Sequence, residues 1–536
     1  MDQKRNASPN PDTNRKFTKT TAATSASSSG TQIPELPQLP TEVWTSIFDN
    51  LSANQLLTLR QVCLRWRNII NSNSTLLAKL TVTFPARLTI SSTYHPENLP
   101  PAAKVHFKNV TITAIGPWWT PFGQGLTELK LSSYSEVDHA SLLAMLKHTP
   151  NLKSFELSES KLGGERPSGE ADFRLDKLEK LVLCGIEDAV PVEVFRQLCG
   201  GLKRLRISWD WFTEEQPVSA QEMGAFLQGL QDSLEELYVT CTEDTLVELM
   251  RLDRLKLRKL TLAGDEHTDD AKSKSLLIEL CRKLPSLEYL KIKGIRTFDE
   301  QSHSLLCKMG QVLPNLNCLQ INGMHVDLAF LHNFPKQLQT FRLSGDSRWD
   351  SGSAVEIQFN GDDHLTLKEL HLKKIHIEDS CLQRHLPKMP HLRSLTIKWC
   401  TSNFWSDLLQ PLKSLKLLTA LSLHGINVNE SADDWTGLEQ DDFAASLARL
   451  QLAQCEMPPK LLATVLTGCP GLRELRLQSM KLNDTADEEQ VVHVVCRKLS
   501  KLSTLIIEGC ELSNEEVDFL RENCKSLKEL RITGCL

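Results

Sequence analysis

Histidine and cysteine side chains, which bind metals and act as nucleophiles, are numerous in this 536-residue chain but form no recognisable site. Each type occurs 15 times. His371 and His376 are close in sequence, as are His385 and His391, but such pairs more often occupy exposed strand or loop positions. The sequence also lacks a Gly-rich phosphate loop, a zinc-protease motif, a nucleophile elbow and a paired-cysteine zinc signature. We therefore expect no catalytic residues, no bound metal and no cofactor.

Lysines and arginines show a clearer pattern, at positions that flank regularly spaced leucines. In the copies that begin at Leu178 through Leu392, nine such positions are basic, and only Glu236 and Glu369 are acidic. The basic residues are Lys180, Arg204, Arg206, Lys259, Lys291, Lys293, Arg342, Lys373 and Lys398. If they share one face, they predict a surface that attracts an acidic or phosphorylated segment. The alternative is a solvated face whose charges maintain solubility.

A repeated leucine pattern must position these side chains. The unit Leu-x-x-Leu-x-Leu, with occasional apolar replacements, occurs sixteen times, with starts 22 to 32 residues apart. Its copies begin at Leu126, Leu152, Leu178, Leu202, Leu234, Leu257, Leu287, Leu316, Leu338, Leu367, Leu392, Leu418, Leu447, Leu472, Leu502 and Leu527. The alternating leucines predict a short strand, and a helical stretch follows in each unit.

One such unit cannot bury its own leucines, so stacked neighbours must form the core. The pattern predicts an α/β solenoid over residues 126–536, a right-handed arc with parallel strands on the concave side and helices on the convex side. Two degenerate leading copies are expected in residues 81–125 and just before them. They read Leu77-x-x-Leu80-x-Val82 and Phe107-x-x-Val110-x-Ile112.

The chain ahead of the repeats divides into two parts. Residues 1–34 are rich in Ser, Thr, Asn and Pro and are expected to form a disordered tail. Residues 35–80 predict three short helices, with Thr41 as the first N-cap and a capping box at Ser52–Gln55 opening the second. Three helices of this size hold too little core to be stable alone, so their apolar surface implies a partner or a neighbouring domain.

Composition restricts the functional class. The net charge of −6 gives no general attraction to nucleic acid or anionic membrane, and no run of 18 apolar residues is present. The start of the chain has no apolar core typical of a signal peptide. Scattered cysteines such as Cys469, Cys496 and Cys524 predict buried free thiols that serve packing. These features favour a cytoplasmic and/or nuclear protein that binds neither membrane nor nucleic acid.

Residues 39–70 resemble the F-box family. The resemblance lies in Leu39-Pro40-x-Glu42-Val43-Trp44-x-x-Ile47-Phe48-x-x-Leu51 and in Leu56-Leu57-x-Leu59-Arg60-x-Val62-Cys63-x-x-Trp66-Arg67-x-Ile69. The repeats resemble the cysteine-containing class of leucine-rich repeats, most closely in the last two copies, 496–510 and 524–535. Together the chain is similar to F-box and leucine-rich-repeat proteins, the substrate receptors of SCF-type ubiquitin ligases.

This resemblance implies a non-catalytic receptor subunit. In the family, the F-box binds the Skp adaptor, which bridges to a cullin scaffold with its RING subunit, and the repeats hold a protein substrate for ubiquitination and proteasomal degradation. The residues implied to line or support the adaptor contact are Leu39, Pro40, Ile47, Leu51, Leu56, Val62, Cys63 and Trp66.

Two other functions stay open on the sequence alone: a non-degradative interaction scaffold, and a receptor that senses a small molecule in the arc. Trp209 and Trp211 are further candidates for substrate contact, because aromatic side chains outside a core can anchor a partner. They begin one of three predicted insertions, at residues 209–222, 346–363 and 430–442.

Overall fold

A computed structural model of the chain describes most of residues 39–534 and divides them into two compact units. The described ranges are 39–97, 99–164, 171–186, 190–209, 218–264, 271–293, 300–322, 328–345, 366–377, 381–428, 444–482, 491–524 and 526–534. The predicted tail at 1–34 and the insertions at 346–363 and 430–442 lie outside them, as does most of 209–222. Unit 1 ends at Asn73 and unit 2 begins at Ser74, so residues 74–80 of the predicted 35–80 region cluster with the repeats.

Unit 1 contains three helices, as predicted: α1 (Thr41–Asp49), α2 (Ala53–Val62) and α3 (Leu64–Ser72). The capping box is confirmed, because the Ser52 hydroxyl accepts from the Gln55 amide while the Gln55 side chain accepts from the Ser52 amide. The prediction of Thr41 as N-cap is wrong. Pro40 occupies that position, without a side-chain hydrogen bond, and the helix already includes Thr41.

The core of unit 1 is small and partly aromatic. Phe48 on α1, Leu56 on α2 and Ile70 on α3 are fully buried. The Trp66 ring lies 5.0 Å from Trp44 and 5.7 Å from Phe48, between centroids. Since aromatic contacts carry much of the stability of a core this size, α1 and α3 hold each other in place mainly through these three rings.

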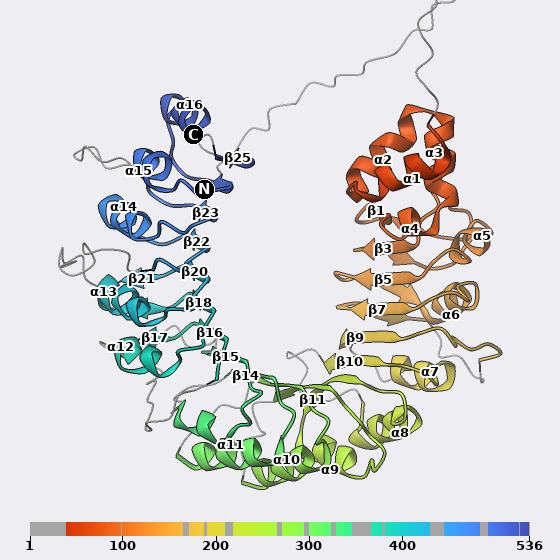
Figure 1. Cartoon of the computed structure of the whole chain (residues 1–536). Helices are drawn as coiled ribbons and strands as arrows, with labels where there is room; N and C mark the ends of the chain where they lie inside the picture. Colours follow the sequence, from red (N-terminus) through yellow and green to blue (C-terminus); the bar gives the residue numbers. More distant parts are fainter. Residues whose placement is uncertain are drawn as a thin grey trace, which may run out of the picture. The chain divides into compact units, whose positions relative to one another are not determined.

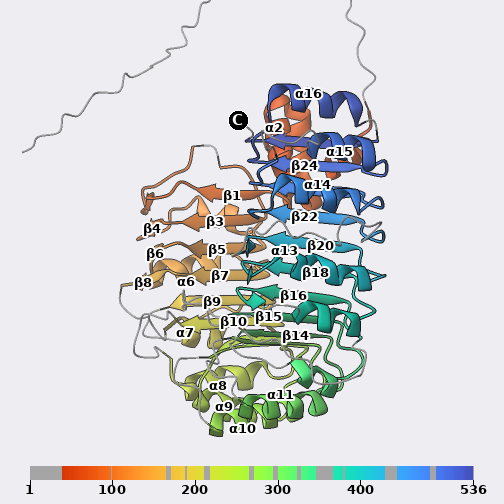
Figure 2. The same cartoon turned by 90° about the vertical axis from the view of Figure 1, so that its left-hand side faces the viewer.

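Unit 2 is built around one sheet of 18 strands, in which each strand pairs in parallel with the next along the sheet. The strands are β1 (Thr81–Phe84), β3 (Lys104–Lys108), β5 (Glu128–Ser132), β7 (Ser154–Ser158), β9 (Lys180–Ile186), β10 (Arg204–Trp209), β11 (Glu236–Cys241), β12 (Lys259–Gly264), β13 (Tyr289–Lys293), β14 (Cys318–Asn322), β15 (Thr340–Ser344), β16 (Glu369–Lys373), β18 (Ser394–Lys398), β20 (Ala420–His424), β22 (Arg449–Ala453), β23 (Glu474–Gln478), β24 (Thr504–Glu508) and β25 (Glu529–Thr533). Figure 2 shows these strands stacked in chain order.

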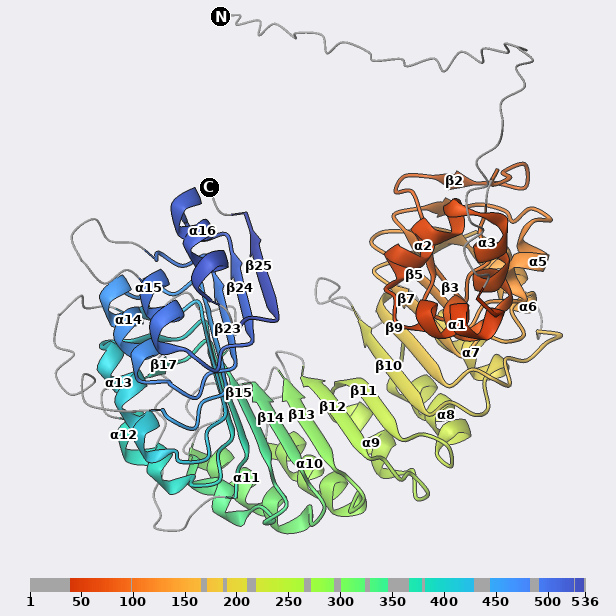
Figure 3. The same cartoon turned by 45° about the horizontal axis from the view of Figure 1, so that its top comes forward.

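Helices follow most strands and cover the convex side of the sheet in unit 2, as Figures 1 and 3 show. They are α4 (Ser74–Leu77), α5 (Trp119–Gly123), α6 (His139–Lys147), α7 (Val190–Leu198), α8 (Ala220–Leu230), α9 (Glu243–Met250), α10 (Ala271–Lys283), α11 (Glu300–Val312), α12 (Cys381–His385), α13 (Trp405–Leu409), α14 (Pro459–Thr467), α15 (Val491–Lys498) and α16 (Asn514–Asn523). Three 3₁₀ segments, η1 (Leu328–Asn333), η2 (Leu386–Lys388) and η3 (Gln410–Ser414), take this place in part of the array.

Two minor sheets complete unit 2. One joins β2 (Thr89–Ile90), β4 (Thr111–Ile112), β6 (Glu136–Asp138) and β8 (Lys161–Gly163), and the other joins β17 (His376–Ile377), β19 (Thr401–Ser402) and β21 (Asn427–Val428). The predicted α/β architecture, a helical domain followed by parallel stacked repeats, is confirmed.

The predicted register is confirmed for all sixteen full copies. In each strand the two alternating apolar residues face the core and align with those of the next strand, as Leu129 aligns with Phe155 and Leu205 with Leu237. The register of both leading copies is wrong. The aligned residues are Val82 and Phe84 in β1 and Val105 and Phe107 in β3, because these pairs, and not the predicted ones, continue the alternation of the sheet.

A left-handed backbone position follows many of the strands. Asn109, Glu159, Lys374, Trp399 and Gln454 have φ between 48° and 55° and directly follow a strand. Four of these amides donate to the last carbonyl of the neighbouring strand, and the Glu159 amide donates to the carbonyl of Cys184 within β9, all at 2.6–3.0 Å. This recurring turn satisfies one backbone group per repeat at the end of the ladder.

The cysteines depart from prediction at one pair. Cys469 is buried, as predicted, but Cys496 and Cys524 form a disulfide with their Cα atoms 5.0 Å apart. The prediction of free thiols fails here because the two residues occupy neighbouring positions of successive repeats, which stacking brings together. Among the described residues, no helix combines the length and apolar character needed to cross a bilayer.

Candidate interaction surfaces

Unit 1 presents an apolar surface to solvent. Seven large hydrophobic side chains are exposed in the described part of the chain, and four of them are Val43, Ile47, Val62 and Leu64. Leu64 is 71% exposed and Val62 is 59% exposed. This density of exposed apolar groups on three short helices is typical of a surface that a partner covers.

The eight residues implied to bind or support the adaptor occupy different environments. Leu56 is buried and therefore supports the helices from inside. Pro40, Ile47, Val62 and Cys63 are exposed. The three partly buried members are Leu39, Leu51 and Trp66. Their role in adaptor binding stays a prediction.

The sequence interpretation missed Val43 and Leu64 as surface residues. α1 carries two apolar pairs, Val43 with Ile47 and Trp44 with Phe48, and only Phe48 is buried. Periodicity identifies both faces without saying which one packs inward. Leu64 directly follows the junction of α2 and α3, where helical periodicity gives no signal.

All nine predicted basic residues lie on the strand positions opposite the buried leucines. Strand pairing arranges them in three rows across the sheet. Lys180, Arg204 and Lys259 belong to the first row, which also holds Glu236 and Glu369. Arg206, Lys291 and Arg342 belong to the middle row, and Lys293, Lys373 and Lys398 to the last.

These cations differ in their pairing. Lys259 Nζ lies 2.7 Å from Glu236 Oε1. The other eight form no ion pair with any carboxylate in the ranges that the structure describes. The face from β9 to β18 therefore carries an excess of positive charge that its own described residues do not neutralise.

Tyr238 on β11 organises two of these cations. The Arg206 guanidinium lies 4.4 Å from the centroid of the Tyr238 ring, and the Lys293 ammonium lies 5.3 Å from it. Cation–π contacts of this kind restrain both side chains at the face of the sheet. The sequence interpretation did not single out Tyr238, because its alignment with Arg206 follows only from the strand pairing.

The surroundings disfavour charge on Lys291. Burial first, and then the charges of Lys293, Arg342 and Arg206, together lower the pKa of Lys291 to about 8. Burial, followed by the charge of Arg206, also lowers the pKa of Lys293. Arg342 Nε is buried without a hydrogen-bond partner among the described residues. Each observation places a cation where its charge is poorly compensated.

A hollow of about 1010 Å³ lies over β5 to β13 on the same face. Lys130, Lys180 and Arg204 line it together with Glu156 and Glu236. Lys130 pairs with Glu156 at 2.7 Å. Arg206, Tyr238 and Tyr289 line it as well, so the hollow combines basic, acidic and aromatic side chains.

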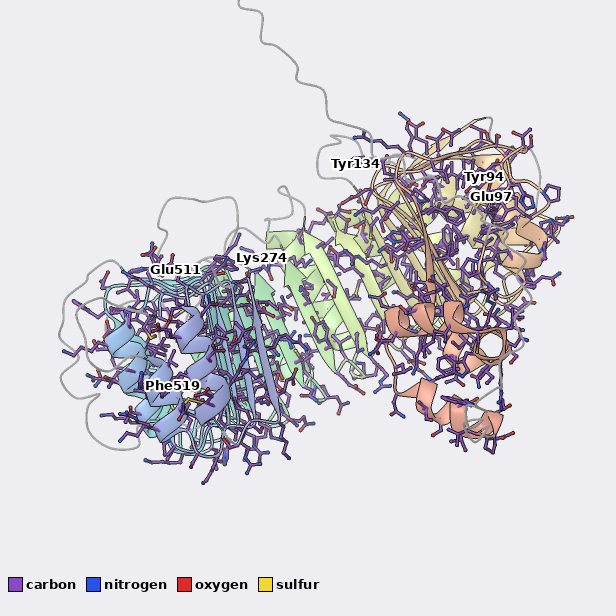
Figure 4. The ribbon with its side chains drawn as sticks, turned by 90° about the horizontal axis from the view of Figure 1, so that it is seen from above. Tyr94, Glu97, Tyr134, Lys274, Glu511 and Phe519 are labelled. Carbon is purple, nitrogen blue, oxygen red and sulfur yellow. A yellow bond between two sulfur atoms is a disulfide. The ribbon has the colours of Figure 1, made fainter. Side chains whose placement is uncertain are left out.

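The side chains of the two predicted tryptophans are not described. Trp209 ends β10, but its side chain and all of Trp211 lie outside the described residues. Within the described ranges, no group of three or more His, Cys, Asp or Glu side chains is arranged to hold a metal ion. Tyr134, which follows β5 and is 80% exposed, projects from the ends of the first repeats (Figure 4).

Comparison with known proteins identifies one family. Residues 36–82 match the F-box-like family model. The solved TLR13–ssRNA13 complex contains a chain that is 16% identical, with a TM-score of 0.45 over 86% of this chain and 75% of that chain. The leucine-rich repeat-containing protein LegL7 from Legionella pneumophila is 12% identical, with a TM-score of 0.33 over 69% of this chain and 98% of its own. At these values, the repeat assignment depends on the strand pairing of the chain itself.

Proposed function

We propose that this chain, an F-box-like domain followed by a solenoid of leucine-rich repeats, is the substrate-recognition subunit of an SCF-type ubiquitin ligase. The observation that carries the proposal is the match of residues 36–82 to the F-box-like family. F-box domains generally bind Skp-type adaptors. The exposed apolar side chains Val43, Ile47, Val62 and Leu64 lie within the same residues and supply a surface for that contact.

In this function the chain catalyses nothing itself. The adaptor connects unit 1 to a cullin scaffold with a RING subunit, and the repeats hold the substrate. Binding both at once raises the local concentration of a substrate lysine near the ubiquitin thioester, which is an effect of proximity and orientation. The proposed outcome is ubiquitination and proteasomal degradation of the substrate, in the cytoplasm and/or the nucleus.

The energetics are consistent with an apolar docking surface. Full burial of one exposed Val or Leu side chain is worth roughly 1.5–3 kcal/mol. Val62 and Leu64 are the most exposed of the four, so they have the most surface left to bury. A charged group at either position would instead have to be desolvated against an apolar partner, at a cost of several kcal/mol.

The direct test is binding of a purified Skp-type adaptor to the full chain, measured by isothermal titration calorimetry. The double substitution Val62→Asp and Leu64→Asp should weaken binding by about 100-fold, or roughly 2.7 kcal/mol. Because both side chains are already exposed, the thermal unfolding of the chain should change little.

A matched control is Leu417→Asp, which places the same charge on an exposed leucine of the repeats, 45% exposed. Adaptor affinity should be unchanged in this variant. Adaptor binding by the Val62/Leu64 double variant at wild-type affinity would refute the proposed docking surface.

A further inference from the structure

Four cations at the centre of the sheet form a distinct group, here called the cation quartet: Arg206, Lys291, Lys293 and Arg342. Three of them occupy the middle row, on β10, β13 and β15, and Lys293 lies two residues after Lys291 on β13. The middle-row positions between them are Tyr238, Thr261 and Gln320, which are uncharged.

The two carboxylates in the first row of this face, Glu236 and Glu369, have other partners. Glu236 pairs with Lys259, and Glu369 accepts a hydrogen bond from Thr340 Oγ1 at 3.2 Å and lies 3.6 Å from His371 Nε2. No member of the quartet forms an ion pair within the described ranges. Uncompensated, partly buried cations are costly, and a bound anion would remove that cost.

Two members of the quartet are restrained by an aromatic ring, and a third has a hydrogen-bond donor without an acceptor among the described residues. Arg206 and Lys293 both contact the Tyr238 ring, so their charges are restrained before a ligand arrives. At the other end, Arg342 Nε is buried without a hydrogen-bond partner among the residues that the structure describes. This donor is the second, independent sign that a hydrogen-bond acceptor is missing from the face.

The spacing of the quartet fits a chain better than a single group. Neighbouring strands lie about 4.8 Å apart, so the backbone positions of Arg206 and Lys291 are separated by roughly 14 Å, and those of Lys291 and Arg342 by roughly 10 Å, along the sheet. An extended peptide advances about 3.4 Å per residue, so roughly seven residues cover the distance from Arg206 to Arg342.

We propose that the cation quartet binds an extended acidic segment of the protein substrate, with several carboxylates distributed over about seven residues and no need for phosphorylation. The inference rests on the proposed function, because it assigns a ligand class to the substrate-binding face. Thr261 and Gln320 lie between the cations and can hydrogen-bond the peptide backbone of the segment.

Two other anions fit less well. A single phosphate is too small to contact all four cations, because the backbone positions of Arg206 and Arg342 lie five strand spacings apart, about 24 Å. A nucleic acid strand needs a long basic track with stacking aromatics. The basic stretch here is bounded, since the middle row continues to Val182 on β9 and to His371 on β16, and the whole chain is acidic.

The test uses fluorescein-labelled 14-residue peptides and fluorescence anisotropy with the full chain. The probe alternates Glu and Ser, and the reference alternates Gln and Ser. The acidic peptide should bind at least tenfold more tightly, with affinity falling as salt rises. Lys291→Gln with Arg342→Gln should weaken its binding at least tenfold.

The matched control is Arg476→Gln with Arg531→Gln. Both arginines lie in the same middle row, on β23 and β25. They already pair with Glu474 at 3.4 Å and with Glu529 at 3.1 Å. Acidic-peptide affinity within twofold of wild type is expected for this control.

Equal affinity for the acidic and the Gln/Ser peptide, or unchanged acidic-peptide affinity in the Lys291/Arg342 variant, would overturn the inference. So would tighter binding of a Gln/Ser peptide that carries one phosphoserine than of the acidic peptide. A single-stranded oligonucleotide that displaces the probe at lower concentration than unlabelled acidic peptide does would also overturn it. Adaptor titration of the same preparations separates the two proposals. A chain that binds the acidic peptide but not the adaptor would retain this site and lose the proposed function.

Discussion

At the scale of single residues, Lys291 shows how the concave face combines burial with like charge. Its ammonium is partly buried, and its charged neighbours Lys293, Arg342 and Arg206 are all cations. A lysine that serves only solubility would extend its ammonium group into water, where the charge has no desolvation penalty. The position of Lys291 therefore favours a binding role for this part of the face over a solvated surface.

The lowered pKa of Lys291 predicts a pH-dependent stability. In the folded chain the pKa is about 8, against an ordinary value of 10.5. Between these values the unfolded chain holds a proton that the folded chain has lost, so the free energy of unfolding rises with pH in this window. Below pH 8 both states are protonated, and the full penalty is present.

Lys291→Gln should accordingly stabilise the chain at pH 7, and its advantage over wild type should shrink as pH rises from about 8 to about 10.5. Thermal unfolding at a series of pH values measures the difference. Lys373→Gln, at an exposed position of the same face, serves as the control and should show no such trend. A stabilisation by Lys291→Gln that stays constant from pH 8 to pH 10.5 would contradict the lowered pKa of Lys291.

At the same scale, the sequence predicted which residues share the face but not which of them act together. Period-two alternation was enough to place all nine basic residues opposite the buried leucines. The contacts of Arg206 and Lys293 with Tyr238 join β10, β11 and β13. They depend on strand order and side-chain conformation, which a single sequence does not specify.

At the scale of elements, the repeat register was predictable wherever leucines mark the inward positions. It failed in β1 and β3, where Val82, Phe84, Val105 and Phe107 replace the leucines and other apolar residues nearby offered a competing match. The left-handed residue after many strands was not predicted either. Its occupants include Asn109, Glu159, Lys374 and Trp399, so no single residue type marks the position.

Trp399 makes this turn testable. A bulky residue with positive φ is a backbone outlier, and its ring lies against Gly425, where an added Cβ would be 2.2 Å from Trp399 Cε3. Gly425→Ala should destabilise the chain by more than the roughly 1–2 kcal/mol of a left-handed alanine, because the ring must also move. Urea unfolding gives the change in free energy.

The comparison variant is Gly509→Ala. Gly509 has a similar φ of 61°, but an added Cβ there would meet only Ser479 Oγ, at 3.3 Å. It should therefore show the backbone cost alone. Combining Gly425→Ala with Trp399→Ala should remove the excess. Equal destabilisation by the two glycine substitutions would show that the Trp399 ring imposes no constraint.

At the scale of the whole molecule, the chain consists of two compact units with different surfaces. The helical unit, which ends at Asn73, has exposed apolar side chains on its surface. The repeat unit, which begins at Ser74, carries the basic face. Both units were recognisable from sequence, one from a dense local motif and the other from sixteen copies of a spacing. The substrate was not recognisable from sequence. The repeat pattern constrains only the residues that face the core, and the residues that face outward can vary with the ligand.

The proposed function requires unit 1 to recruit a ubiquitin ligase to proteins that the repeats hold. The most direct measurement captures the full chain from proteasome-inhibited cells and compares it with the Val62→Asp, Leu64→Asp variant. We predict that both capture the same substrate proteins, whereas cullin and ubiquitin conjugates on those proteins accompany only the unmodified chain. Equal amounts of cullin with both chains, or no cullin and no conjugates with either, would contradict the claim and favour a non-degradative scaffold.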